Sequence, residues 1–443
     1  MSLASTAPGL LSRSEGYLRS AAIFGEAGTV DAYLRVEAAL AEVEGRLGVI
    51  PPEAVAPILA ACDRRRLDME ALRQGAAAVG YPVVPLVAML GRLAGAHGQW
   101  VHYGATTQDV MDTALVLQLR DALSGVLDDL AGLEALLADL CTRHRHTPVA
   151  GRSKLQHGVP VSFGYKAAVW LDQIARARAG LGRALAEAAV LQFGGAVGTL
   201  ASLRGAGMAV RRELAAELSL AEPDISWHVS RDRLAALACA IATELAALAK
   251  LAGDVAHMMS TEVAELREPA AKGRGSSSTM PQKRNPVLCE AILEAAHEAR
   301  SAPAVLLEAM LQEHERGIGQ GYRERAALAH AVQNLGGAVS LASDLLSGLE
   351  VDSARMARNL DLTGGLIHSE AVMMHLSEQL GRLRAHDVLH EVALRIAEGG
   401  RDLDAALQEV AGITLPPGVI GTEAQIGTAQ EMIDRVLRRN ARP

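Results

Sequence analysis

The sequence predicts an all-α protein, because its composition, its proline spacing and its leucine spacing all favour helices. Half of the 443 residues are apolar but only 3% are aromatic, which suits Ala/Leu helix packing better than β-sheets. Proline is costly inside a helix, and it is absent from residues 86–147, 161–222, 224–268 and 304–415. Leucine or valine recurs at alternating spacings of four and three residues, which is the apolar stripe of a long bundle helix. The stripe consists of Leu119, Leu123, Val126, Leu130, Leu133, Leu137 and Leu140.

The order of these elements predicts three helical domains, since the chain is too long for one ordinary core. Shorter helices are expected in an N-terminal domain, residues 1–112, and in a C-terminal domain, residues 362–443. The central domain, residues 113–361, holds the long helices, because the proline-free windows fall mainly there. These helices are expected to follow the leucine stripe and to lie near 164–192, within 224–268 and near 287–312. Helices of this length bury little alone, so a bundle completed by self-association is expected.

Charge and composition exclude several classes of function. The formal net charge is −8 and the pI is near 6, so the chain lacks the basic footprint of a nucleic-acid or membrane-surface binder. A small soluble ligand is therefore expected. No run approaches the roughly 18 uninterrupted apolar residues of a membrane-spanning helix, and no signal peptide is recognised.

The cysteine and histidine patterns predict neither disulfides nor a metal site. The four cysteines are solitary and lie in helical patterns, which fits a reducing, cytoplasmic location. His144 and His146 are two residues apart, so they point to different helix faces. This spacing favours a solvated helix end over a metal site. These residues therefore predict no metal site. The cysteines are Cys62, Cys141, Cys239 and Cys289.

Three polar stretches interrupt the Ala/Leu background near the ends of the long helices. They are HYGATTQD (102–109), GRSKLQHGVPVSFG (151–164) and GRGSSSTMPQKRNP (273–286), the last called the signature loop below. Helix ends carry unpaired N–H groups and partial positive charge, so such stretches suit an anionic ligand. Each has a structural alternative: Thr106, Thr107 and Asp109 as a helix cap, Lys154 and His157 as exposed loop residues, and the serine run as a linker.

The same stretches resemble the fumarase/aspartase superfamily. SSTMPQKRNP resembles its signature segment, and HYGATTQDVMDTA and GRSKLQHGVPVSFG resemble its first two shared regions. FGGAVGTLASL (193–203) is similar to the adenylosuccinate lyase and 3-carboxy-cis,cis-muconate cycloisomerase branches. The resemblance implies a cofactor-free homotetramer whose central domains form a twenty-helix bundle, with active sites shared between three subunits. It also implies removal of a proton next to a carboxylate of a small anionic dicarboxylate.

The resemblance also implies roles for individual residues. Counted from MPQK, the serine base falls on Ser277, and Lys283 and Asn285 take the carboxylate-binding and intermediate-stabilising positions. A Gly/Ser-rich turn and a nearby lysine would favour the alkoxide that a serine base requires. The remaining positions that the resemblance links to substrate carboxylates are Thr106, Thr107, Gln156 and Arg325, with Arg13 or Arg19 as an additional charge.

Two departures from the family pattern bear on the reaction. Lys154 stands where many members have a catalytic histidine, with His157 as a possible substitute, and Tyr81 lies where adenylosuccinate lyases bind phosphate. Lysine, with an ordinary pKa near 10, gives up its proton reluctantly, so a leaving group already stable as an anion is favoured. Arg325 favours a succinate framework.

These residues support four hypotheses. The first is β-elimination of a stable anion from a substituted succinate to give fumarate, with nitrosuccinate, which would release nitrite, as the concrete candidate. The second is a lactonising 3-carboxy-cis,cis-muconate cycloisomerase. An adenylosuccinate- or argininosuccinate-type carbon–nitrogen lyase is the third. The fourth, from another class, is a catalytically silent structural homologue, against which the intact Ser277, Lys283 and Asn285 argue.

Overall fold

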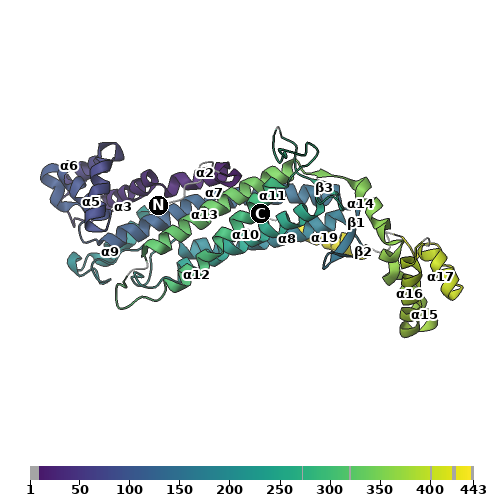
Figure 1. Ribbon diagram of the computed structural model, residues 1–443. Coiled ribbons are helices and arrows are strands. Elements are labelled where there is room, and N and C mark those ends of the chain that lie inside the picture. Colours follow the sequence, from purple (N-terminus) through teal and green to yellow (C-terminus); the bar gives the residue numbers. More distant parts are fainter. Residues whose placement is uncertain (1–8, 272, 319–320, 400–401, 422–425, 441–443) are drawn as a thin grey trace. The chain divides into compact units, whose positions relative to one another are not determined.

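The computed structural model is all-α, as the sequence predicts (Figure 1). It describes residues 9–271, 273–318, 321–399, 402–421 and 426–440. The longest of its helices, α7 (Thr107–Arg143), has 37 residues. The strands within the described ranges are short and form two-stranded antiparallel pairs, β1 with β2 and β3 with β4.

The remaining elements have the following bounds. The helices before and after α7 are α1 (Leu10–Arg13), α2 (Glu15–Phe24), α3 (Glu26–Arg46), α4 (Pro52–Ala61), α5 (Met69–Val79), α6 (Val83–Leu93), α8 (Phe163–Ala188), α9 (Gly207–Glu217), α10 (Asp232–Met258), α11 (Val287–Ala299), α12 (Ser301–Glu308), α13 (Gly321–Ser347), α14 (Ser353–Leu360), α15 (Ser369–Leu380), α16 (Arg382–Ala397), α17 (Leu403–Ala411) and α19 (Ala429–Asn440). The strands are β1 (Pro148–Ser153), β2 (Gln156–Ser162), β3 (Leu266–Arg267) and β4 (Glu350–Val351), and short 3₁₀ helices are η1 (Arg64–Arg66), η2 (Gly95–Trp100), η3 (Ala201–Leu203), η4 (Asp361–Thr363) and η5 (Leu366–His368).

Contacts divide the chain into two compact units. Unit 1 consists of Met1–Leu130, Ala177–Leu248 and Ala291–Leu341, and unit 2 of Ala131–Arg176, Ala249–Glu290 and Ala342–Pro443. The unit boundaries fall inside α7, α8, α10, α11 and α13, so each of these helices contributes residues to both units. The three-domain division with boundaries after residues 112 and 361 stays a prediction.

The leucine stripe of α7 is buried, which confirms that its spacing marks a core-facing helix. Each of its seven side chains is at most 2% exposed. Burying a leucine or valine side chain contributes about 1.5–3 kcal/mol, so the stripe is a principal source of bundle stability. The predicted helix near 287–312 is instead two helices, α11 and α12, which meet at Arg300.

In unit 1, the turn between α5 and α6 follows directly from the sequence. Asp68 accepts hydrogen bonds from the N–H groups of Glu70 and Ala71 and so caps the start of α5. Gly80 ends the helix with φ +89°, a left-handed conformation that glycine adopts without strain. Helices α5 and α6 then pack against each other (Figure 1), and the turn between them presents Tyr81.

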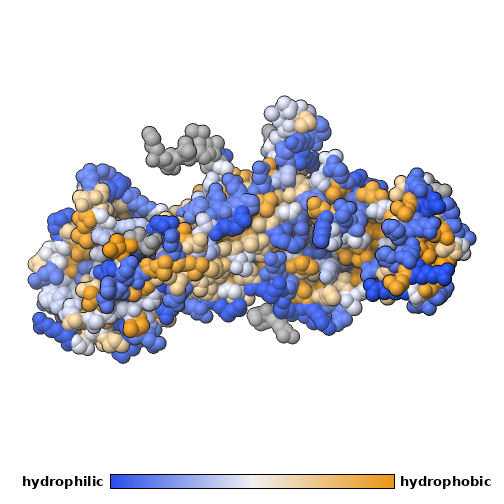
Figure 2. All heavy atoms as spheres, turned by 60° about the horizontal axis from the view of Figure 1, so that its bottom comes forward, coloured by the Kyte–Doolittle hydropathy of each residue, from blue (hydrophilic) through white to orange (hydrophobic). Residues whose placement is uncertain are grey.

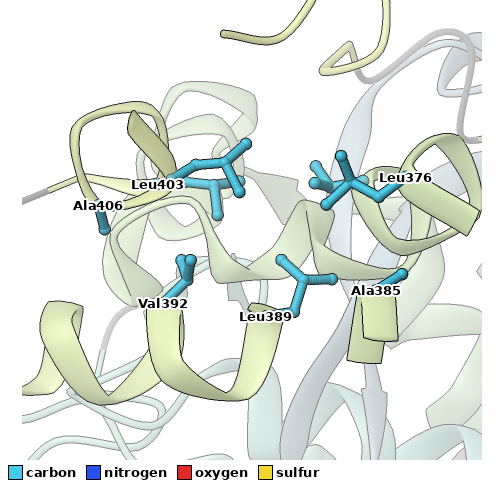
Figure 3. Packing of buried hydrophobic residues seen from close by; sticks show 8 residues of the cluster. Leu376, Ala385, Leu389, Val392, Leu403 and Ala406 are labelled. Atoms are coloured by element: carbon cyan, nitrogen blue, oxygen red, sulfur yellow. The ribbon is translucent and has the colours of Figure 1, made fainter. Parts of the chain in front are cut away.

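In unit 2, helices α15, α16 and α17 enclose a small core of their own. Helix α16 packs against both α15 and α17. Their apolar side chains converge at helical spacing, as Figure 3 shows, which explains why this C-terminal segment is helical despite its short elements. The buried members are Val372, Leu376, Ala385, Leu389, Val392, Leu403, Ala406 and Leu407.

Helix α10 is, by length and composition, apolar enough to cross a membrane, with a mean hydropathy of 1.8 over its most apolar window. Charged residues such as Glu244 and Lys250 interrupt this helix, so it contains no long uninterrupted apolar run. Of this window, 56% is buried inside the protein, and a core helix of a bundle passes the same test.

Glu44 of α3 is a buried acid without a hydrogen-bond partner among the described residues. Burial, with a smaller contribution from Glu37, raises the pKa of Glu44 to about 9. This folded pKa lies above the unfolded value, so the stability contribution is full at low pH and is lost as pH rises toward 9. At pH 7 the loss amounts to about 3 kcal/mol, at 1.36 kcal/mol per pH unit.

Glu44→Gln is therefore expected to flatten the fall in stability between pH 5 and pH 9, because glutamine cannot ionise. Thermal or urea unfolding of the wild type and the variant across this range measures the difference. Glu53→Gln, at an exposed position of α4, is the matched control and should follow the wild type. Parallel curves for wild type and Glu44→Gln would contradict the buried-acid explanation.

Candidate active site

Unit 1 contains a cavity of about 310 Å³ that brings together three residues predicted to bind substrate carboxylates. Thr106 and Thr107 reach it from the start of α7, and Arg325 from the first turns of α13. Arg325 lies more than 200 positions from the two threonines in the sequence, so only the fold makes them neighbours. The lining residues are Tyr81, Thr106, Thr107, Gln108, Met111, Arg231, Gln312, Arg316, Gly317, Gly321, Tyr322 and Arg325.

Asp109 fixes the start of α7 beneath this cavity. Its carboxylate accepts the N–H of Thr106 at 3.0 Å, the return contact of a capping box. The N–H groups of Gly194 and Gly195 donate to the same carboxylate, each at 2.9 Å. His228 Nε2 lies 2.7 Å from Asp109 Oδ1. Asp109 therefore caps the helix, as the structural alternative held, and also ties it to the 193–203 loop.

Two glycines of the FGGAVG segment occupy positions where a side chain would be crowded or strained. A Cβ at Gly194 would lie 2.4 Å from Ser226 Oγ, too close for any side chain. Gly195 has φ +69°, a left-handed conformation that glycine adopts most easily. The segment that resembles two branches of the superfamily thus has a physical role here: it lets two backbone N–H groups reach Asp109.

A buried network of four charges contributes Arg231 and Arg325 to the lining of the cavity. Arg231 donates to Asp112 at 2.8 Å and to Glu324 at 2.9 Å, and all three side chains are almost fully buried. Arg325 donates from Nη2 to Asp112 at 2.6 Å and from Nη1 to the carbonyl of Met111 at 2.6 Å. Burial alone would raise the pKa of Asp112, but Arg231 and Arg325 outweigh it and hold that pKa below its usual range.

Arg316 is a cavity residue that the sequence interpretation missed. Its Nε donates to Gln108 Oε1 at 2.9 Å, and its Nη1 lies 3.5 Å from Thr106 Oγ1. Both partners are neutral, and among the described acids none forms an ion pair with it. The arginine-rich stretch 316–325 offered a signal, but Arg325 was selected there because its position matched the family pattern. Among the lining residues that the structure describes, Arg316 is therefore an arginine without an acidic partner.

The signature loop lies in unit 2 and has an ordered neck. Residues Ser276 and Arg284 form an antiparallel bridge, and the N–H of Asn285 donates to the carbonyl of Gly275 at 2.9 Å. At Gly275, φ is +66° and a Cβ would lie 2.6 Å from the carbonyl oxygen of Asn285, so this neck requires glycine. Lys283 is exposed. The serine run is therefore part of a turn structure rather than a plain linker.

Ser277 is half-buried within this loop and its hydroxyl oxygen faces two backbone donors. The N–H of Met280 lies 3.1 Å from Ser277 Oγ and that of Thr279 lies 3.4 Å from it. Donors aimed at a serine oxygen stabilise negative charge on it. Ser276 and Ser278 are exposed, and Ser276 Oγ donates instead to the carbonyl of Gly273. The loop geometry therefore distinguishes Ser277 from its two neighbours.

Glu268 anchors the far end of the signature loop. Its buried carboxylate accepts the N–H groups of Leu288 and Cys289 at 3.1 Å and 2.9 Å, in the first turn of α11. Two unpaired N–H groups at a helix start are thereby satisfied by a carboxylate from outside the helix. Asn285 stands two residues before α11, so this contact holds its backbone in place.

The second predicted stretch is a β-hairpin, which the sequence did not predict. Lys154 and Leu155 form a two-residue turn in which both φ angles are positive, +53° and +66°. Such turns favour Asn-Gly or Asp-Gly, so Lys-Leu gives no sequence signal and stores strain at the tip. The turn exposes Lys154 and Gln156 at the tip of the hairpin.

His157 and Arg19 have distinct surroundings. Burial, followed by Arg152, lowers the pKa of His157, so this imidazole is neutral near pH 7 and a poor proton donor. Arg152 itself pairs with the fully buried Glu265 at 2.7 Å. Arg19, on α2, does not line the unit 1 cavity but forms an ion pair with Asp129 of α7.

Comparison with known proteins identifies the class. A family model described as "Lyase" matches residues 19–300, and one described as "Adenylosuccinate lyase C-terminus" matches residues 365–436. The first covers more than half of the chain. The chain therefore belongs to the lyases of the fumarase/aspartase superfamily, as the motifs predicted.

Individual relatives narrow the comparison. A 3-carboxy-cis,cis-muconate cycloisomerase of Pseudomonas aeruginosa is 44% identical over 397 residues, 89% of this chain and 86% of the relative. An N-acetyl-S-(2-succino)cysteine lyase of Enterococcus italicus is 36% identical, over 88% of this chain and 86% of the relative. The crystal structure of the 3-carboxy-cis,cis-muconate lactonizing enzyme from Pseudomonas putida has a TM-score of 0.90 and 39% identity, covering 96% of this chain and 97% of that one.

Proposed function

We propose that the protein catalyses the reversible cyclisation of a small unsaturated polycarboxylate of the 3-carboxy-cis,cis-muconate type to a lactone. Ser277 serves as the proton-transferring group. In this proposal Arg316, Thr106 and Thr107 bind one substrate carboxylate, and Lys283 and Asn285 stabilise the intermediate. The elimination of an anion from a succinate, which the sequence favoured, becomes the second candidate.

The observation that carries this change is the pairing of Arg325 with Asp112. Arg325 was the residue that favoured a succinate framework, but its guanidinium donates to Asp112 and to a backbone carbonyl. A guanidinium engaged in this way is a weaker argument for a substrate carboxylate at that position. The cycloisomerase relatives, at 44% and 41% identity, support the lactonising alternative.

The chemistry requires one proton transfer and one carbon–oxygen bond. In the cyclising direction a substrate carboxylate oxygen bonds to the unsaturated carbon γ to its own carbonyl, which closes the lactone ring. Ser277 delivers a proton to the adjacent carbon, which is next to another carboxylate, and the alkoxide that this leaves regains a proton from water. In the opening direction the serine alkoxide removes that proton and the carboxylate leaves as an anion. The two N–H groups facing Ser277 Oγ stabilise the alkoxide in both directions. Lys154 then needs to supply only positive charge to the departing carboxylate.

Arg316→Ala is expected to raise KM about 10-fold to 100-fold with a smaller change in kcat, because a charge-assisted hydrogen bond to a carboxylate contributes about 1.5–3 kcal/mol. Steady-state kinetics with the substrate that the protein turns over measure both constants. Arg323→Ala is the matched control, since Arg323 pairs with Glu308 and does not line the cavity. Equal effects of the two substitutions would contradict the anchor role.

A fumarate-forming lyase is the second candidate, favoured by the N-acetyl-S-(2-succino)cysteine lyase relatives at 36% and 33% identity. A thiolate, like nitrite, is a leaving group stable as an anion, so the replacement of the usual histidine by Lys154 suits this reaction as well. Nitrosuccinate stays in this class as one candidate substrate.

A substrate panel separates the candidates. The purified protein is offered 3-carboxy-cis,cis-muconate, N-acetyl-S-(2-succino)cysteine, nitrosuccinate, argininosuccinate, adenylosuccinate and aspartate. Ultraviolet absorbance follows loss of the diene or formation of fumarate, and thiol, nitrite and ammonia assays identify the leaving group. Loss of the diene with lactone as product supports the first proposal. Fumarate with no lactone selects elimination, and inactivity on every substrate indicates a silent homologue.

Self-association as a homotetramer in the cytoplasm completes the proposal. The single chain exposes large apolar side chains that a soluble protein ordinarily covers, and Figure 2 shows apolar residues in orange among polar ones on one face. Light scattering coupled to size-exclusion chromatography tests the assembly, with a monomer as the contradicting result. The most exposed examples are Ile318, Leu383, Ile225, Leu311 and Leu155.

A further inference from the structure

Two tyrosines line the unit 1 cavity without a role in the steps proposed above. Tyr81 comes from the turn between α5 and α6, and Tyr322 from the first turn of α13. Their side chains are 52% and 54% exposed in the single chain, which is high for aromatic residues. Large aromatic side chains that remain accessible at the edge of a polar cavity are well suited to contact a ligand.

The two tyrosines are held by one turn. The Tyr322 hydroxyl donates to the carbonyl of Gly80 at 2.6 Å. Gly80 precedes Tyr81 directly and has φ +89°. The hydrogen bond therefore links the start of α13 to the α5–α6 turn, and this fixes the backbone from which Tyr81 projects.

The Tyr81 hydroxyl, in contrast, forms no hydrogen bond with any residue that the structure describes. Tyr81 and Tyr322 line the same cavity. Tyr81 thus offers an O–H donor on the lining that also carries Arg316 and the Thr106 and Thr107 hydroxyls. It has no protein acceptor to give up when a ligand binds.

We propose that Tyr81 is a specificity-determining residue that selects planar, conjugated substrates with a carboxylate beyond the one bound at Arg316. Its ring packs against the planar carbon skeleton, and its hydroxyl donates to the additional carboxylate. A flexible saturated acid of equal charge satisfies Arg316 equally well but lies poorly against the ring. This inference rests on the proposed function for its substrate class, although its test does not require turnover.

Calorimetric binding of two unreactive acids to the full chain tests this role. Benzene-1,2,4-tricarboxylate is the planar probe and propane-1,2,3-tricarboxylate the saturated one. The wild type is expected to bind the planar probe more tightly. Tyr81→Phe should weaken the binding of the planar probe about 10-fold, the usual effect of losing a hydrogen bond to a charged group. It should change the affinity for the saturated probe less than about 3-fold. Tyr81→Ala should abolish the preference.

Tyr17→Phe is the control, because Tyr17 lies on α2 and does not line the cavity. It should bind both probes as the wild type does. Three outcomes overturn the inference: no planar preference in the wild type, unchanged binding by Tyr81→Phe, or equal weakening of both probes. A protein that shows the expected binding pattern but forms no lactone would retain this inference while the proposed function fails. Lactone formation without the expected binding pattern would support the proposed function and contradict the role of Tyr81.

Discussion

Ser277→Ala is expected to reduce turnover by about 10²-fold to 10⁴-fold, the usual contribution of a positioned general base. Ser277 Oγ is the serine oxygen of the loop that faces two backbone N–H donors, from Thr279 and Met280. Alanine removes the proton-transferring group but leaves these donors and the neck of the loop unchanged. The measurement is kcat with the substrate that the panel identifies, together with thermal stability and assembly size, which should match the wild type.

Ser278→Ala is the matched control for this prediction. Ser278 is the next residue, its side chain is exposed, and the same single oxygen is lost. Its turnover should stay within a few-fold of the wild type. An inactive Ser278→Ala together with an active Ser277→Ala would identify Ser278 as the base instead of Ser277. Three consecutive serines make such a shift of one position in the alignment easy. Equal activity of both variants would remove the serine loop from the mechanism altogether.

Mixed assemblies test the proposal that subunits share active sites. Ser277→Ala removes the proton-transferring group and Arg316→Ala weakens substrate binding, so both variants have low activity when the substrate concentration is below the wild-type KM. Both variants fold if the residues act only in catalysis and binding. If these residues reach one site from different subunits, co-refolding the two variants should restore part of the activity, because some sites then contain both wild-type residues. Activity that stays at the level of the separate variants would contradict shared sites.

The long helices were predictable because their signals are local. The leucine stripe of α7 repeats at helical spacing, and the proline-free window ends at Pro148, five residues after the helix ends at Arg143. The hairpin was not predictable, because Lys154 and Leu155 occupy a turn that usually contains glycine or asparagine. Strain of this kind depends on contacts far along the chain, which no local window contains.

Part of the candidate site was predictable because some of its residues belong to local sequence motifs. Thr106, Thr107 and Ser277 belong to short motifs whose order and spacing are specific. Arg316 has no such motif, and its proposed role follows from its neutral partners and from the lack of an acidic partner among the residues that the structure describes, which only the fold reveals. The pairing of Arg325 with Asp112 joins residues 213 positions apart, so the sequence alone left Arg325 available for substrate.

Asp112→Asn is expected to lower the free energy of unfolding by about 3–5 kcal/mol, the usual result of removing one partner from a buried ion pair. Asp112 accepts hydrogen bonds from Arg231 and Arg325 and is fully buried. Asparagine is nearly isosteric, so the variant creates no cavity but leaves two guanidinium groups with less compensating charge. Glu324 still neutralises Arg231, whereas Arg325 loses the acid that it pairs with. Urea unfolding at pH 7 measures the difference.

Asp139→Asn is the matched control, because Asp139 pairs with Arg143 on the exposed face of α7 and such pairs contribute about 0.5 kcal/mol or less. The pH dependence separates a charge effect from a packing effect. Since Arg231 and Arg325 hold the pKa of Asp112 below its usual range, its stabilisation is full above about pH 4 and is lost as pH falls through the lower folded value. The gap between wild type and Asp112→Asn should therefore narrow in acid. A gap that stays constant would assign the loss to packing, and Arg325 would then be free to bind a substrate carboxylate, which would restore the argument for a succinate.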